Sequence, residues 1–177
     1  MDKILHSSES NEWETPQLLF DILDSNIHFK LDPCATKDNH KCEKYYTVED
    51  DGLSKHWKGP VFMNPPYGRE IGKWVKKAYE TSLPDLFHDK ARVVGLIPAR
   101  PDTKYWFNYI FLKAWVIFLK GRLKFSNPGV GECIGAPFPS ALVFWGDFKK
   151  VDIYDISFDL NICGDYENAV VVTLAVN

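Results

Sequence analysis

The chain has 177 residues, of which 45% are apolar, 25% charged and 15% aromatic, and its formal net charge at pH 7 is −3. These values are close to globular averages and exclude disorder, collagen-like repetition and a coiled coil. At this length folding buries roughly 70% of the surface of the unfolded chain. We therefore expect a single domain spanning residues 1–177, whose core needs neither a disulfide nor a metal.

The distribution of residue types also bears on location and redox state. No run approaches the ~20 apolar residues of a membrane span, and residues 1–14 lack the apolar stretch of a secretory signal. We expect a cytoplasmic protein with no membrane partner. The four cysteines form no CxxC pair. Cys34, His40 and Cys42 lie close together, but such uneven spacing does not make a tetrahedral set, so we expect reduced thiols and no metal.

The charge is unevenly spread along the chain. Residues 69–124 carry 12 basic and 5 acidic side chains, a formal charge of +7, whereas residues 1–68 and 125–177 each carry −5. A local basic surface of this kind can contact phosphates while the acidic remainder limits unspecific adhesion. The alternative is that the lysines only keep an exposed helix soluble.

Apolar periodicity predicts alternating helices and strands. Thr15-Pro16 is typical of an N-cap followed by proline at the first helical position, and an apolar helical face follows at residues 18–23. Further along the chain we expect a strand at 29–31 ending at Asp32-Pro33, a short strand at 45–48, a strand at 61–63, an amphipathic helix at 71–79, a strand at 91–97, a helix that is capped by Asp102 and runs through Leu112, and strands at 115–119 and 141–145.

This order predicts an α/β fold with a parallel or mostly parallel sheet and helices on both faces. Residues 121–125, 152–157 and 170–176 are predicted to add an antiparallel edge. Ligands bind such sheets beyond the carboxyl ends of the strands. The strand ends at Asp32 and Asn64 therefore fall where a site is expected.

The strongest motif is Asn64-Pro65-Pro66-Tyr67, which follows an apolar strand and cannot continue it. The amide oxygen of Asn64 and the carbonyl of Pro65 could each accept an N–H bond from an exocyclic amino group, which frees the delocalised lone pair of its nitrogen. Tyr67 offers a face on which an unstacked base can lie. The alternative is a tight turn between a strand and a helix.

Seven further ordered segments support a resemblance. Together with the tetrad, residues 13–23, 31–36, 49–57, 68–78, 96–107, 121–125 and 137–145 resemble the phage-type DNA N-6-adenine methyltransferases, a Dam-like family. The resemblance implies a minimal Rossmann-like S-adenosylmethionine-dependent domain without a separate target-recognition domain. It also implies double-stranded DNA as the partner and N6 of adenine as the methyl acceptor, in the cytoplasm of a bacterial host if the gene is a phage's.

The resemblance also assigns residues. Asn64, Pro65, Pro66 and Tyr67 would be catalytic, and Asp32 would lie near the methionine ammonium of the cofactor. The other expected cofactor contacts, to which Asn64 also belongs, are Thr15, Pro16, Pro33, Cys34 and Asp51. Alternatives stay open: Thr15 could only cap a helix, Asp32 could only cap a turn, and Asp50 competes with Asp51 for the cofactor's adenine amino group.

Two features depart from the wider methyltransferase pattern. Cys34-Ala35-Thr36 replaces the usual glycine-rich turn after the first strand. The acidic residue for the ribose hydroxyls is unassigned, with Glu43 and Glu49 as candidates.

DNA contacts are expected from the basic third of the chain. The candidates are Arg69, Lys73, Arg100, Lys104 and Arg122, with Lys120 and Lys124 beside them. Each could instead be a solvated surface charge. Two other functions remain open, namely N-methylation of RNA or of a protein glutamine, and a non-catalytic module that binds cofactor or DNA. The recognition sequence and the oligomeric state are not legible in the sequence.

Overall fold

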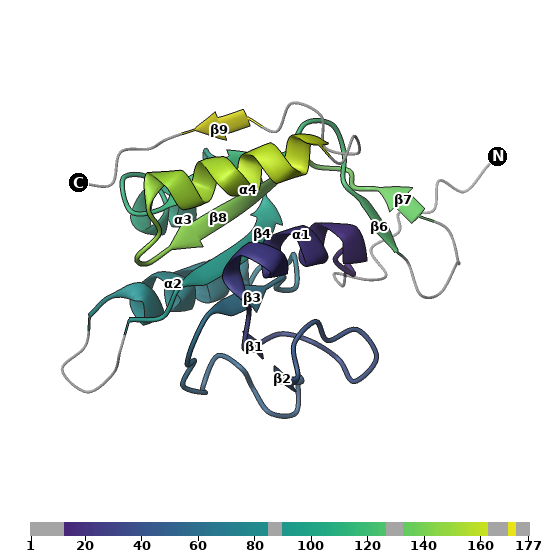
Figure 1. Cartoon of the computed structure of the whole chain (residues 1–177). Helices are drawn as coiled ribbons and strands as arrows, with labels where there is room; N and C mark the ends of the chain where they lie inside the picture. Colours follow the sequence, from purple (N-terminus) through teal and green to yellow (C-terminus); the bar gives the residue numbers. More distant parts are fainter. Residues whose placement is uncertain (1–12, 85–89, 127–132, 163–169, 173–177) are drawn as a thin grey trace.

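The computed structural model of the chain (Figure 1) describes residues 13–84, 90–126, 133–162 and 170–172. Residues 126, 133, 134 and 170–172 are described by their backbone alone. The main sheet has seven strands in the order β2-β1-β3-β4-β8-β5-β9, and β6 and β7 form a separate antiparallel ribbon. In chain order the elements are α1 (Gln17–Ile27), β1 (Leu31–Asp32), β2 (Lys44–Tyr45), β3 (Val61–Met63), α2 (Ile71–Ser82), β4 (Val93–Pro98), α3 (Lys104–Tyr109), β5 (Trp115–Phe118), β6 (Lys124–Ser126), β7 (Cys133–Gly135), β8 (Ser140–Trp145), α4 (Lys150–Ile162) and β9 (Val170–Val172).

The predicted α/β class is confirmed, with one change in strand direction. Strands β1 to β5 run in one direction, and β9 adds the predicted antiparallel edge. However, β8 is antiparallel and lies between β4 and β5, not at an edge. Because β8 is antiparallel to β5, it begins at the end of the sheet where β5 ends. The β6–β7 ribbon lies between these two strands in the sequence. An antiparallel neighbour needs no crossover helix, so β8 can insert directly.

The predicted edge strand at 152–157 is wrong, because these residues lie within helix α4. Ile153, Ile156 and Leu160 are buried at helical spacing, whereas Val151 and Phe158 on the opposite side are more than half exposed. A helix that is apolar on two sides has no amphipathic signal, and this hides its period in the sequence.

Two predicted caps are also wrong. Pro16, not Thr15, is the N-cap of α1, and no side chain bonds the first turn of that helix. Helix α3 begins after Thr103, and Asp102 does not cap it. The two-residue strands β1 and β2 each share only one residue with the predicted spans 29–31 and 45–48. By contrast, β3 occupies Val61–Met63 as predicted, because the prolines that follow Asn64 end it.

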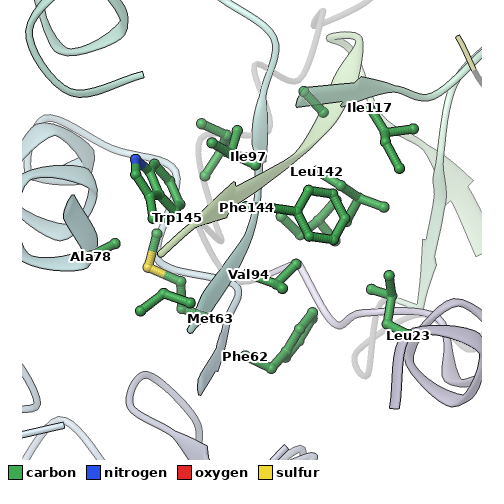
Figure 2. Close-up of a cluster of buried hydrophobic side chains, with 14 of the residues drawn as sticks. Leu23, Phe62, Met63, Ala78, Val94, Ile97, Ile117, Leu142, Phe144 and Trp145 are labelled. Atoms are coloured by element: carbon green, nitrogen blue, oxygen red, sulfur yellow. The ribbon is translucent and has the colours of Figure 1, made fainter. Parts of the chain in front are cut away.

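Helices cover both faces of the sheet (Figure 1), with α1 packed beside α4 and α2 beside α3. Successive side chains of a strand point to opposite faces, and β3 shows this plainly (Figure 2). Phe62 meets Phe20 of α1 with ring centroids 5.2 Å apart. Met63 lies on the other face with Ala78 and Trp145. All five side chains are at most 6% exposed, so the central strands are held from both sides.

The parallel pairing brings the predicted site together. Leu31 of β1 pairs with Val61 of β3, and Val61 pairs with Val93 of β4. The carboxyl ends of these strands, at Asp32, Met63 and Pro98, therefore lie at one end of the sheet. None of the helices in the described ranges is long and apolar enough to cross a membrane.

Candidate active site

A cleft of about 490 Å³ opens at the carboxyl ends of β1 and β3. Its volume is in the range of pockets that hold small molecules and cofactors. The cleft is lined by residues 13–15 before α1, residues 32–37 with Asn39 and Lys41 after β1, residues 47–49 with Asp51 and Gly52, the turn residues Asn64 and Pro66, and Trp74 of α2. Six of the seven expected cofactor residues are in this lining, and Pro16 is the one that is not.

Asp32 supplies a buried carboxyl group to the wall of the cleft. Its side chain is only 4% exposed, and its two oxygens accept backbone N–H bonds from Cys34 (3.3 Å) and Lys41 (3.1 Å). Burial raises the pKa of Asp32 to about 6, although both hydrogen bonds act in the opposite direction. Asp32 therefore caps the turn and also faces the cleft, where a cationic group would stabilise its charged form.

Asn64 lies at the end of β3 with its two amide atoms in different situations. The Nδ2 group donates to the backbone carbonyl of Trp13 and to Oγ1 of Thr15, the latter at 2.9 Å. The Oδ1 atom is buried and has no hydrogen-bond partner among the described residues. Buried acceptors are nearly always paired, so this orphaned oxygen indicates a missing donor. A ligand amino group at the cleft would supply one.

Tyr67 lies behind the turn, outside the cleft lining. Its ring is 9% exposed, and it meets Phe138 and Phe125 edge to face with centroids 5.2 and 6.3 Å away. Trp13 packs on the same two phenylalanines. Burial raises the pKa of the Tyr67 hydroxyl well above its usual range, which keeps it a neutral donor. These four rings, the aromatic cluster, border the turn that carries Asn64.

The loop after β2 separates the two candidate aspartates. Asp50 caps its own turn, because its carboxylate accepts bonds from the backbone N–H and the hydroxyl of Thr47, both at 2.9 Å. Asp51 lines the cleft instead, with φ of 54°. The geometry therefore favours Asp51 over Asp50 as a ligand contact. Glu49 also lines the cleft, whereas Glu43 does not.

The segment that replaces the glycine-rich turn is held by one backbone and one side-chain hydrogen bond. The N–H of Ala35 donates to the carbonyl of Tyr46 (3.0 Å), and the N–H of Thr36 donates to Oδ1 of Asn39 (2.7 Å). Cys34 is a free thiol in the cleft wall, and burial raises its pKa well above the usual range. No group of three possible metal ligands gathers within the described part of the chain.

Sequence reasoning missed Gly52 and Lys41. A Cβ on Gly52 would lie 2.0 Å from the carbonyl oxygen of Pro33, so only glycine lets these two walls of the cleft approach. Lys41 has a side chain that is 8% exposed, and its Nζ reaches Oε1 of Gln17 (3.0 Å) and of Glu14 (3.6 Å). The glycine in the quoted segment 49–57 was a usable signal. Nothing in the sequence marks the lysine.

The expected DNA-contacting residues are exposed around the same end of the sheet. Arg69 and Lys73 follow β3, Arg100 and Lys104 follow β4, and Arg122 follows β5. Because β3, β4 and β5 run in one direction, their following segments emerge at the end that holds the cleft. Lys73 is paired with Glu70, and the Arg100 guanidinium lies 5.9 Å from the ring centre of Phe138.

The fold and the cleft together define a Rossmann-like methyltransferase: a mostly parallel sheet, a cofactor-sized cleft past its strand ends, and an asparagine acceptor at the tip of a central strand. The DNA N-6-adenine-methyltransferase (Dam) family matches residues 3–158, and the chain belongs to this family. The resemblance stated from the sequence is thus confirmed, and with it the class of adenine-specific DNA methyltransferases.

Individual relatives agree with this membership. The chain is 33% identical over 130 residues to a DNA N-6-adenine-methyltransferase of Haemophilus phage HP1, which covers 71% of this chain and 72% of the relative. It is 34% identical over 150 residues to a protein of the same name from Escherichia phage T1, covering 75% and 60%. The putative methyltransferase YfdM of Escherichia coli K12 is 38% identical over 65 residues, or 32% of this chain and 71% of the relative.

Proposed function

We propose that this chain transfers a methyl group from S-adenosylmethionine to N6 of adenine at specific sites in double-stranded DNA, and that Asn64 is the residue on which the reaction depends. The observation that carries the proposal is the orphaned Oδ1 of Asn64. When bound, the cofactor supplies the methyl group on a positively charged sulfur. The target amino group needs an acceptor beside it, and Asn64 offers one at the rim of the cleft.

Asn64 acts on the attacking nitrogen. Its Oδ1 accepts one N–H bond from the amino group, and the Pro65 carbonyl is proposed to accept the other. These bonds would draw the nitrogen toward tetrahedral geometry and stabilise the positive charge that develops on it as its bond to the methyl carbon forms and the carbon–sulfur bond breaks. The leaving group would be the neutral thioether, and the surplus proton of the methylated nitrogen would pass to solvent. Preorganised polar groups of this kind commonly lower the activation barrier by a few kcal/mol each. No covalent intermediate on the protein and no metal is required.

The residues of the cleft fit the cofactor. The Asp32 carboxylate, buried beside two backbone donors, is proposed to hold the methionine ammonium, and Asp51 the adenine amino group. Pro33 and Cys34 would contact the methionine end. Thr15 is only 3% exposed, and its hydroxyl accepts a hydrogen bond from Asn64.

DNA would approach the end of the sheet that carries the exposed basic residues, with phosphates contacting Arg69, Lys73, Arg100, Lys104 and Arg122. The target adenine has to leave the helix, because a stacked base cannot place its amino group in line with the methyl carbon. The aromatic cluster borders the turn where the extruded base would arrive, and Tyr67 is its member within the catalytic tetrad.

The test is a methyl-transfer assay with labelled S-adenosylmethionine on duplex DNA, RNA and protein, followed by mapping of methylated adenines. We expect label on N6 of adenine in duplex DNA at defined sequences. The control is Asn64→Ala, which should bind cofactor normally but lose at least ~10²-fold in turnover. Equal or better labelling of RNA or protein would refute the DNA substrate, and unchanged turnover of Asn64→Ala would remove Asn64 from its role.

A further inference from the structure

The side chain of Asn64 can act only in one of its two amide orientations. With Oδ1 toward the substrate it accepts an N–H bond. Rotated by 180°, it would present its own N–H groups to an amino group that also donates. The catalytic asparagine therefore needs a device that sets its amide, and the tetrad itself does not contain one.

We propose that the backbone carbonyl of Trp13 and the hydroxyl of Thr15 form an orientation lock for the amide of Asn64, which makes Thr15 a positioning residue for methyl transfer. The proposal rests on the role of Asn64 given above. The Nδ2 group contacts the Trp13 carbonyl and Thr15 Oγ1 together. These two acceptors use both of its N–H bonds, so only Oδ1 remains for the substrate.

The two acceptors have different parts in the lock. A backbone carbonyl can only accept, so the amide atom beside Trp13 has to be the nitrogen, since an oxygen there would face a second set of lone pairs. A hydroxyl can donate or accept and would tolerate either orientation. The Trp13 carbonyl therefore sets the direction, and Thr15 holds the second N–H that would otherwise be free to bond the ligand.

The segment that carries the lock is itself held in place. On one side the Trp13 ring packs on Phe125 and Phe138 with centroids 5.3 and 5.7 Å away. On the other side Lys41 bonds Gln17 and pairs with Glu14. Thr15 lies between these anchors and is 3% exposed, too buried to serve as a solvent-facing residue. The sequence predicted that the Thr15 side chain would cap α1, but it makes no such bond. Its hydroxyl bonds Asn64 instead.

The test is a double-mutant cycle between positions 15 and 64. Thr15→Val removes the acceptor at nearly constant shape, and Thr15→Ser keeps the hydroxyl as the matched control. With Asn64 present, we expect Thr15→Val to lower kcat about tenfold and to leave the KM for S-adenosylmethionine within about twofold of wild type. Thr15→Ser should recover most of that loss. In the Asn64→Ala background, Thr15→Val should lower kcat no further.

Other outcomes separate the alternatives. A rise in the KM for cofactor with unchanged kcat would show that Thr15 is a cofactor contact and would overturn the lock. If Thr15→Val lowered kcat a full tenfold in the Asn64→Ala background, the lock would also be overturned. If Asn64→Ala keeps wild-type turnover, the proposed function fails as well. If Asn64→Ala is inactive but Thr15 acts independently of it, the lock alone fails.

A second measurement needs no activity. Asn64→Asp places an oxygen against the Trp13 carbonyl, whereas Asn64→Ala places nothing there. We expect Asn64→Asp to melt at a lower temperature than Asn64→Ala at pH 8, with both proteins folded by circular dichroism. An aspartate variant that is as stable as wild type would overturn the lock, because the carbonyl would then not be selecting nitrogen.

Discussion

The hydroxyl of Tyr67 donates a hydrogen bond to the backbone carbonyl of Leu96 at 3.1 Å, which joins the turn after β3 to the neighbouring strand β4. Leu96 is fully buried, and the Tyr67 ring packs against Phe125 and Phe138 within the aromatic cluster. The last residue of the tetrad is therefore tied to the sheet, and the position of Asn64 three residues earlier depends on this tie. Tyr67 supports the turn, whatever contact its ring makes with a base.

Tyr67→Phe should lower the free energy of unfolding by about 1–3 kcal/mol, because the Leu96 carbonyl is left buried without its donor. The ring stays, so turnover should fall far less than in Tyr67→Ala. Urea unfolding measures the first effect and the methyl-transfer assay the second. A phenylalanine variant that is fully stable yet inactive would show instead that the hydroxyl acts in the reaction.

Asp32 should make the stability of the cofactor-free protein fall with rising pH. Burial raises its pKa from 3.8 in the unfolded chain to about 6 in the folded one. Between these values the folded state holds a proton that the unfolded state has lost, so the contribution is fully present below pH 4 and disappears as pH rises through 6. The difference is on the order of 3 kcal/mol. Urea unfolding of wild type and of Asp32→Asn at pH 4 to 7 measures this difference. If the free energies of unfolding of the two proteins changed with pH in the same way, the prediction would be contradicted.

Cofactor affinity should change with pH in the opposite sense. If the Asp32 carboxylate holds the methionine ammonium, binding requires the charged form, which is the minor form below the pKa of about 6. The Kd for S-adenosylmethionine should therefore rise up to tenfold for each pH unit below 6 and level off above 7. Isothermal titration calorimetry from pH 5 to 8 measures this. A Kd for wild type that does not change between pH 5 and 6.5 would remove Asp32 from ammonium binding.

Gly52→Ala should destabilise the protein and weaken cofactor binding, because the new Cβ would lie 2.0 Å from the Pro33 carbonyl oxygen. Backbone has to move, so we expect a loss of at least ~2 kcal/mol. Gly72→Ala is the matched control. It lies within α2, where the nearest atom to its Cβ would be 3.8 Å away, and should stabilise the protein by about 0.5–1 kcal/mol. Equal melting temperatures for the two variants would contradict the close approach.

Local sequence patterns predicted correctly those helices and strands whose boundaries or apolar face are set by a few neighbouring residues. The apolar run Val61–Met63 followed by two prolines can only be a strand that stops, and β3 has these bounds. The one-sided apolar face of α2 likewise predicted a helix. Helix α4 was missed because it is apolar on two sides. The strand β8 was predicted, but its antiparallel direction was not, because strand direction depends on which neighbour a strand pairs with and not on its own residues.

By itself the sequence of this protein determined the fold class, the family, and the two strand ends that carry Asp32 and Asn64, because periodicity, proline punctuation and the tetrad are all local in the chain. Only the tertiary structure decided that Thr15 bonds Asn64 instead of capping a helix, and that Gly52 lies against Pro33. These contacts join residues 49 and 19 positions apart in the chain. Whether two such residues meet depends on how the sheet and its loops pack, which no local pattern records.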